Sequence, residues 1–366
     1  MTGPSIFENR GDIPSGVEIT DTFDDALKEL FFIENPRLRK DHPDAQKLLE
    51  EFFSRRKNND VWIFYPWSNK LIHTLPEDLY FTLRTARNRN IITVQEQQKY
   101  RQIKVGIAGL SVGSAIVSSL VRSGGPKVLK IADFDIVELS NLNRMQATIL
   151  DMGSNKTHVL AKQIWEIDPF AELHLWDSGL SRVNLDEFIS GKPALDIFID
   201  EMDGLDLKFS ARLICRKNKI PVLMATDNGD DVIIDIERFD LEEARPVFHG
   251  LVDEKKPEEL NNLNYRTWLK LSTQIVSPNY LTEKMQESLL EIGKTISAVP
   301  QLGTTASVAG AAISYAVRRI ASHQNMPSGR YAIGLEEKLV PNFSSPDNVE
   351  KRAKKTNDFL NKFGKY

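Results

Sequence analysis

The stretch Val105-Gly-Ile-Ala-Gly-Leu-Ser-Val-Gly113, followed after one helical segment by Val128-Leu-Lys-Ile-Ala-Asp133, decides the fold of this chain. Residues 105–109 form a short apolar run that is typical of a buried strand, and residues 128–133 repeat that pattern. Between them, residues 112–122 have the periodicity of a helix. The sequence therefore predicts a βαβ unit, with a tight turn where the first strand meets the helix.

This turn has the residues of a phosphate site. Gly109, Ser111 and Gly113 lie at the strand-to-helix junction, where glycine lets the backbone approach a phosphate and the helix N-terminus offers N–H donors. Asp133, at the tip of the second strand, is placed to accept hydrogen bonds from ribose hydroxyls. These features predict a nucleotide site, but they do not separate ATP from NAD.

A polar cluster after Asp133 favours ATP. Asp135, Asn141 and Arg144 follow within one loop, and Lys156 begins the next predicted helix. Two cations close to a nucleotide would serve a triphosphate, whereas hydride transfer has little use for them. We expect Asn141 to orient the nucleoside, although an asparagine there can also shape the loop as an Asx turn.

The same cluster resembles the ThiF/MoeB superfamily of adenylyltransferases, to which the ubiquitin-activating enzymes belong. Its members carry D-x-D-x-V-x-x-S-N-L-x-R and a lysine about a dozen residues later. The matching residues here are Asp133, Asp135, Val137, Ser140, Asn141, Leu142, Arg144 and Lys156. The resemblance runs from Arg87 to about Ala321 and implies that the chain uses ATP to activate a carboxylate.

Two further site residues are implied by the resemblance alone. Arg89 matches the arginine that reaches the phosphates of ATP in the neighbouring protomer, which implies a homodimer with a shared active site. Asp203 matches the aspartate that holds Mg²⁺ near the α-phosphate. The chain departs from the family in its glycine turn, usually G-x-G-G-x-G, and in Met202-Asp203-Gly204, where the family has T-D-N. Near this second departure, Glu201 and Asp206 are candidates for additional acidic ligands.

The chain has one cysteine, Cys215. A single thiol excludes an internal disulfide and the paired C-x-x-C zinc site of several bacterial relatives, and it fits a reducing cytoplasm. Cys215 falls in a predicted helix, which favours a packed core thiol over a nucleophile. An acyl-adenylate would then be captured by an external nucleophile, such as a sulfur donor or an amine.

Composition excludes two classes of partner. The net charge is −4, from 47 basic and 51 acidic residues, so we expect no general attraction to nucleic acid. No apolar run reaches the roughly 20 residues of a membrane span, and the first residues lack the pattern of a signal peptide. We therefore expect a cytoplasmic protein without a membrane partner.

The pattern of elements predicts a Rossmann-like, doubly wound α/β fold with a mainly parallel sheet and a helical N-terminal extension. The expected domains are the extension (1–80), an ATP-binding adenylation domain (81–340) and a charged C-terminal helix or tail (341–366). Strands are predicted near 104–109, 128–133, 172–176, 195–200 and 221–225, and helices near 112–123, 155–167, 184–190 and 206–217. In the extension we expect helices at 24–32 and 43–56 and a short strand at 61–65.

The leading functional hypothesis is an ATP-dependent adenylyltransferase that activates the C-terminal carboxylate of a small protein or peptide. One alternative is a nicotinamide- or flavin-dependent oxidoreductase that uses the same glycine turn. Another is a catalytically silent subunit that keeps the fold as a scaffold. The cations Arg144 and Lys156 argue against the first alternative, and their presence together with Asp133 and Asp203 argues against the second.

Overall fold

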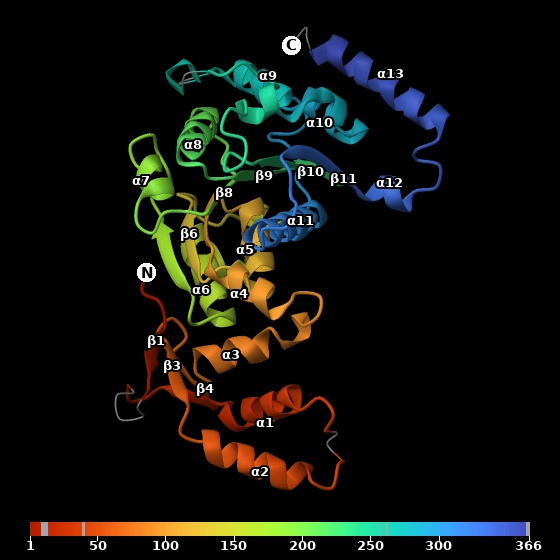
Figure 1. The fold of residues 1–366 in the computed structure, drawn as a ribbon. Helices are drawn as coiled ribbons and strands as arrows, with labels where there is room; N and C mark the ends of the chain where they lie inside the picture. The colour runs from red at the N-terminus through yellow and green to blue at the C-terminus, as the bar shows by residue number, and fades with distance from the viewer. Residues whose placement is uncertain (9–13, 39–40, 256, 261–262, 364–366) are drawn as a thin grey trace.

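The computed structural model describes residues 1–8, 14–38, 41–255, 257–260 and 263–363. Its centre is a seven-stranded sheet in the order β11-β10-β9-β8-β5-β6-β7 (Figure 1). The strands are β5 (Lys104–Ala108), β6 (Val128–Ala132), β7 (Glu172–Trp176), β8 (Ile197–Asp200), β9 (Val222–Asn228), β10 (Asp231–Glu237) and β11 (Gly329–Gly334). The five strands from β5 to β9 run parallel, and β10 and β11 add an antiparallel edge. This arrangement confirms the Rossmann-like, mainly parallel α/β fold.

Helices cover both faces of the sheet because buried strands of this kind are apolar on each side. One face packs against α4 (Val94–Gln102), α5 (Val112–Arg122), α6 (Lys156–Ile167) and α11 (Gly303–Ala321), and the other against α7 (Leu185–Ser190) and α8 (Leu205–Asn218). Helices α5 and α11 cross closely at Gly310, where a Cβ would lie 2.7 Å from the carbonyl oxygen of Ala115. The absence of a side chain at Gly310 thus permits the crossing.

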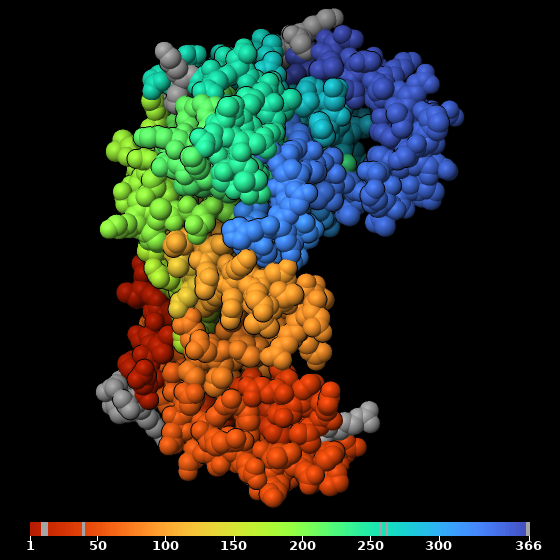
Figure 2. Space-filling view, viewed as in Figure 1, coloured from red at the N-terminus to blue at the C-terminus, as the bar shows by residue number. Residues whose placement is uncertain are grey.

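The N-terminal extension contains a sheet as well as helices. Its helices are α1 (Phe23–Glu34) and α2 (Ala45–Arg56), and its strands β1 (Ser5–Phe7), β3 (Val61–Tyr65), β4 (Lys70–Thr74) and β2 (Glu18–Asp21) pair in that order. The prediction of a helical extension was therefore incomplete, because only β3 has a sequence pattern strong enough to indicate a strand. With α3 (Glu77–Arg84), this part forms a lobe at one end of the molecule (Figure 2), and its strand β3 packs into the main core through Val61, Ile63 and Tyr65.

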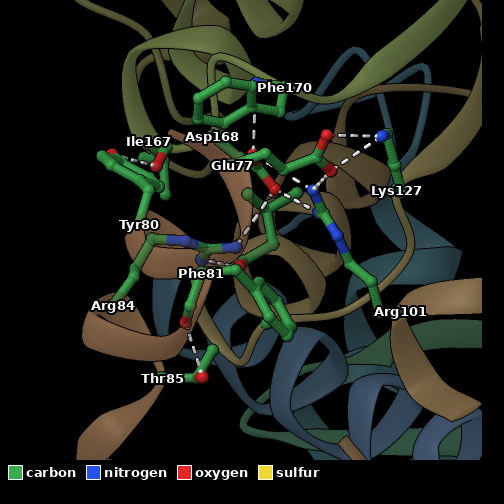
Figure 3. Close-up of polar contacts among 12 residues, drawn as sticks. Glu77, Tyr80, Phe81, Arg84, Thr85, Arg101, Lys127, Ile167, Asp168 and Phe170 are labelled. Atoms are coloured by element: carbon green, nitrogen blue, oxygen red, sulfur yellow. Dashed lines mark hydrogen bonds and ion pairs between the residues drawn. The ribbon is translucent and has the colours of Figure 1, made fainter. Parts of the chain in front are cut away.

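A network of charges joins the N-terminal lobe to the main sheet (Figure 3). Asp168, which follows α6, accepts hydrogen bonds from Arg84 of α3 and Arg101 of α4. Glu77 of α3 accepts one from Arg101 and lies 2.7 Å from the Nζ of Lys127. Because Asp168 is only 2% exposed, its charge depends on the two arginines for compensation.

The C-terminal segments cover the carboxyl ends of the parallel strands. Helices α9 (Tyr265–Val276) and α10 (Glu283–Glu291) lie over this edge, and α13 (Pro346–Phe363) packs on them through Phe359 and Phe363 (Figure 1). The predicted charged C-terminal helix therefore exists, but its apolar side is buried. Within the described residues, no helix is long and apolar enough to cross a membrane.

Candidate active site

A cavity of about 590 Å³ opens where β5, β6, β8 and β9 end, between the sheet and α9 and α10. The glycine turn forms part of its wall. Gly109 has φ +91°, and a Cβ on it would lie 2.2 Å from the carbonyl oxygen of Glu201. Only glycine fits this close passage between neighbouring strand ends. Gly113 does not line the cavity; it lies in α5, where a Cβ would meet Ile107 at 3.2 Å.

Asp133 ties this turn to the end of β6. Its Oδ2 accepts a hydrogen bond from the N–H of Leu110 at 2.7 Å, and its Oδ1 accepts one from the N–H of Asp135 at 2.9 Å. The side chain lines the cavity and is nearly buried, and this burial raises the pKa of its carboxyl group. Asp133 therefore shapes the turn and presents its carboxylate at the position expected for a ribose contact.

Lys156, the first residue of α6, supports the two aspartates from inside. Its Nζ lies 2.7 Å from Asp135 and 4.0 Å from Asp133, and the residue is 5% exposed. Asp135, the partner of Lys156 in the shorter ion pair, has a half-exposed side chain. Lys156 therefore compensates the charge of two carboxylates at the cavity wall. A phosphate that contacts Lys156 would compete with Asp133 and Asp135 for this ammonium group.

Arg144 reaches the glycine turn from the loop after β6. Its Nε donates a hydrogen bond to the Oγ of Ser111 at 2.8 Å, and an Nη donates to Asn143 at 2.8 Å. Burial lowers the pKa of Arg144, while Asp227 and Asp203 nearby act in the opposite direction. The guanidinium group thus stands between the phosphate-type turn and two carboxylates.

Asn141 lies in the same loop and also lines the cavity. Its Oδ1 accepts a hydrogen bond from the N–H of Glu138 at 3.0 Å, and the residue is 8% exposed. This bond reaches three residues back, so it is one half of a capping box with Glu138 and not the Asx turn that the sequence left open. This contact leaves the amide nitrogen available for a nucleoside.

Asp203 and Glu201 extend the wall beyond β8. Asp203 is exposed, and its carbonyl oxygen accepts a hydrogen bond from the indole of Trp268 in α9 at 3.3 Å. Glu201 accepts one from the N–H of Ala225 at 2.8 Å, and burial raises its pKa well above the usual value. Asp206, the other candidate acidic ligand, lies outside the cavity lining.

The described residues contain no group of three or more histidine, cysteine, aspartate or glutamate side chains arranged to hold a metal ion. A Mg²⁺ ion that arrives with a nucleotide has a smaller requirement, because one or two carboxylates and the phosphates are sufficient. Asp203, exposed at the cavity and close to Arg144, fits that requirement.

The structure does not bring Arg89 to the other predicted site residues of its own chain. Arg89 follows the short helix η2 (Ala86–Asn88) and is exposed, outside the cavity lining. Cys215 lies in α8 and is fully buried, which confirms the interpretation as a packed core thiol.

Sequence reasoning did not select two residues that the structure places in the cavity. Asp227, at the end of β9, is 9% exposed, and in the described part of the chain neither carboxylate oxygen has a partner with the length and angle of a hydrogen bond. Ser272 of α9 also lines the cavity with a buried hydroxyl that has no partner among the described residues. Asp227 lies at the carboxyl end of β9, a buried strand parallel to β8, and the rule that ligands bind at this end of parallel strands could have found it.

Comparison with known proteins identifies relatives of the chain. The model of the ThiF family matches residues 85–353. An uncharacterised protein of Mycobacterium tuberculosis (strain CDC 1551 / Oshkosh) is 36% identical over 278 residues, which are 76% of this chain and 38% of that protein. The tRNA threonylcarbamoyladenosine dehydratase 2 of Saccharomyces cerevisiae is 35% identical over 117 residues, 32% of this chain and 26% of the yeast protein.

A third relative is a probable molybdopterin-synthase adenylyltransferase of Porphyra purpurea. It is 32% identical over 136 residues, which are 36% of this chain and 34% of the algal protein. The chain thus spans between about a quarter and two fifths of the length of these three relatives.

Proposed function

The chain belongs to the ThiF family, and from this premise we propose that it is an ATP-dependent adenylyltransferase that activates a carboxylate as an acyl-adenylate. One observation carries the proposal: Asp133, Arg144 and Lys156 gather with the glycine turn around a single cavity at the carboxyl edge of a parallel sheet. Nucleotides bind at this edge in such folds. A hydride-transfer enzyme or a silent scaffold does not require this combination of charges.

In the proposed reaction an oxygen of the substrate carboxylate attacks the α-phosphorus of ATP, the bond from that phosphorus to the bridging oxygen breaks, and pyrophosphate leaves. Such a transfer needs positioning and charge compensation more than covalent help. Arg144, 2.8 Å from Ser111 in the glycine turn, is placed to compensate negative charge on the phosphates. Lys156 keeps Asp133 and Asp135 in place beside the nucleoside position.

Mg²⁺ would be held by Asp203 together with the phosphates, and when bound it would supply additional positive charge at the α-phosphate. Pyrophosphate is a better leaving group when its charge is compensated. The protein contributes Arg144 to the same end.

We further propose a homodimer in which Arg89 acts in the partner's active site. The exposure of Arg89 supports this proposal, as does its setting. Ile91 is 80% exposed and Val94 is 60% exposed, so two exposed apolar residues follow the arginine closely in the chain. Exposed apolar residues that lie close together are typical of an interface.

The proposed acyl substrate is the C-terminus of a small protein or peptide, and the reaction would take place in the cytoplasm. Cys215 is buried and its pKa is raised well above the usual value, so it is unsuited to capture the acyl group. The acyl-adenylate therefore passes to an external nucleophile, such as a sulfur donor or an amine.

Exchange of radiolabelled pyrophosphate into ATP tests the proposal, because it requires a reversible adenylation and no final acceptor. We expect exchange that depends on a peptide substrate and is lost in Arg144→Ala. A thermal-shift comparison separates the rivals: stabilisation by NADH but not by MgATP would favour an oxidoreductase. Binding of MgATP without exchange for any peptide would favour the scaffold.

A further inference from the structure

One wall of the cavity contains none of the residues proposed to contact the nucleotide. It consists of apolar side chains from α9, α10 and the segment after α10, which we call the apolar wall: Leu269, Ile275, Met285, Leu289 and Val299. Two buried polar groups share the cavity with this wall, the carboxylate of Asp227 and the hydroxyl of Ser272.

The residue after Asp227 holds the apolar wall in position. The amide of Asn228 donates a hydrogen bond to the carbonyl oxygen of Tyr280 at 2.6 Å and accepts one from the N–H of Thr282 at 2.9 Å. The connection between α9 and α10 is thereby fixed to the end of β9. Asp227 and the apolar wall therefore line the same cavity, and the wall lies next to Asp227.

The charges around Asp227 are not balanced. Among the described residues, Arg144 acts electrostatically on Asp227, and the same guanidinium group also acts on Asp203. Gln301 and Arg144 lie near Asp227, but neither forms a hydrogen bond of accepted length and angle with its oxygens. A buried carboxylate without a donor is costly, and a cationic ligand would remove this cost.

We propose that Asp227 binds the ammonium group of the acyl substrate, with Ser272 as a second polar contact, while aliphatic carbons of the substrate lie against the apolar wall. The substrate is then an aliphatic carboxylic acid with a primary amine near its activated end. This chemistry has two sources, a free amino acid or a peptide whose C-terminal residue is lysine-like. The inference rests on the proposed adenylation, and it adds the substrate class.

Two matched pairs of acids test the inference by pyrophosphate exchange. Norleucine and hexanoate differ only in the α-ammonium group, and N-acetylated tripeptides that end in lysine or norleucine differ only in the side-chain ammonium group. We expect the amine-bearing member of one pair to support exchange at least about tenfold faster at limiting concentration, the effect of a charge-assisted hydrogen bond. A preference in the norleucine pair would identify a free amino acid as the substrate, and a preference in the tripeptide pair would identify a peptide that ends in a lysine-like residue.

Variants show which residues produce the preference for the amine-bearing acid. Asp227→Asn should reduce it to less than about threefold without weakening MgATP binding, and Ser272→Ala should weaken it to a smaller degree. Asp230→Asn, in the same turn but outside the cavity lining, should keep the preference. A higher Mg²⁺ requirement in Asp227→Asn would instead identify a metal ligand and overturn the inference.

Equal exchange with both members of each pair would overturn the inference but leave the adenylation intact. Absence of exchange with all four acids would also overturn it. Calorimetric titration with MgATP, which needs no acyl substrate, then shows whether the proposed function fails as well.

Discussion

Replacement of Asp227 by asparagine should make the ligand-free protein more stable, and the gain should depend on pH. Burial raises the pKa of this carboxyl group from 3.8 to about 6 in the folded chain, although Arg144 nearby acts against the rise. The folded state therefore disfavours the charged form, whereas the unfolded chain accepts it freely. Asparagine keeps the shape and removes the charge.

The magnitude follows from the rise in pKa. At about 1.4 kcal/mol for each pKa unit, ionisation of Asp227 costs the folded state about 3 kcal/mol once both folded and unfolded chains are ionised. Below about pH 4 the group is protonated in both states and the cost disappears. Stability is thus lost as the pH rises through the interval between 3.8 and about 6, and Asp227→Asn should recover up to about 3 kcal/mol above it.

Urea unfolding of the wild type and Asp227→Asn at about pH 4.5 and about pH 8 measures this effect, with Asp230→Asn as the control in the same turn. We expect a higher free energy of unfolding for Asp227→Asn at the higher pH and a much smaller gain at the lower one. A variant that is equally stable or less stable at both pH values would show that Asp227 is compensated in the folded chain. The reasoning about an unbalanced carboxylate would then be refuted.

Three further experiments test other parts of the structure. Gly109→Ala should destabilise the protein by about 2 kcal/mol or more and abolish MgATP binding in calorimetry, because its Cβ would meet a backbone oxygen at 2.2 Å; unchanged binding would contradict the close-turn geometry. Asp168→Asn should cost about 3 kcal/mol in urea unfolding and expose the N-terminal lobe to proteolysis, since two arginines lose their buried partner; wild-type resistance would mean that the lobe is held by other contacts. Arg89→Ala and Asp203→Asn should each lack pyrophosphate exchange. An equal mixture of the two variants should regain about a quarter of wild-type activity, because half of the dimers are then heterodimers and each heterodimer has one intact site. No recovery in a mixture shown to contain heterodimers would contradict a shared site.

The central sheet could be predicted from the sequence because its strands are short apolar runs between helices of clear periodicity. Strands β5 and β6 differ from the predicted ranges by one residue at most, since burial on both faces leaves few polar positions. The N-terminal sheet was harder to predict. Strands β1 and β2 are mostly exposed, so their pairing depends on β3 and β4 rather than on their own composition.

The cavity was predicted in part for a similar reason. Asp133, Arg144 and Lys156 are close in sequence to one strand end, and a local pattern identifies them. Ser272 belongs to α9, which reaches the cavity through tertiary contacts such as the bond from Trp268 to Asp203 and the bonds between Asn228 and the segment before α10. The place of Ser272 in the cavity depends on how α9 packs, and no sequence motif around Ser272 indicates it.

A crystal structure with a bound MgATP analogue tests the central claim most directly. It should show the triphosphate at the Gly109 turn with Arg144 in contact with a phosphate, the ribose beside Asp133, and the metal ion on Asp203. A nucleotide bound elsewhere, or at this cavity with Arg144 and Asp203 both directed away from the phosphates, would contradict the proposed adenylation site.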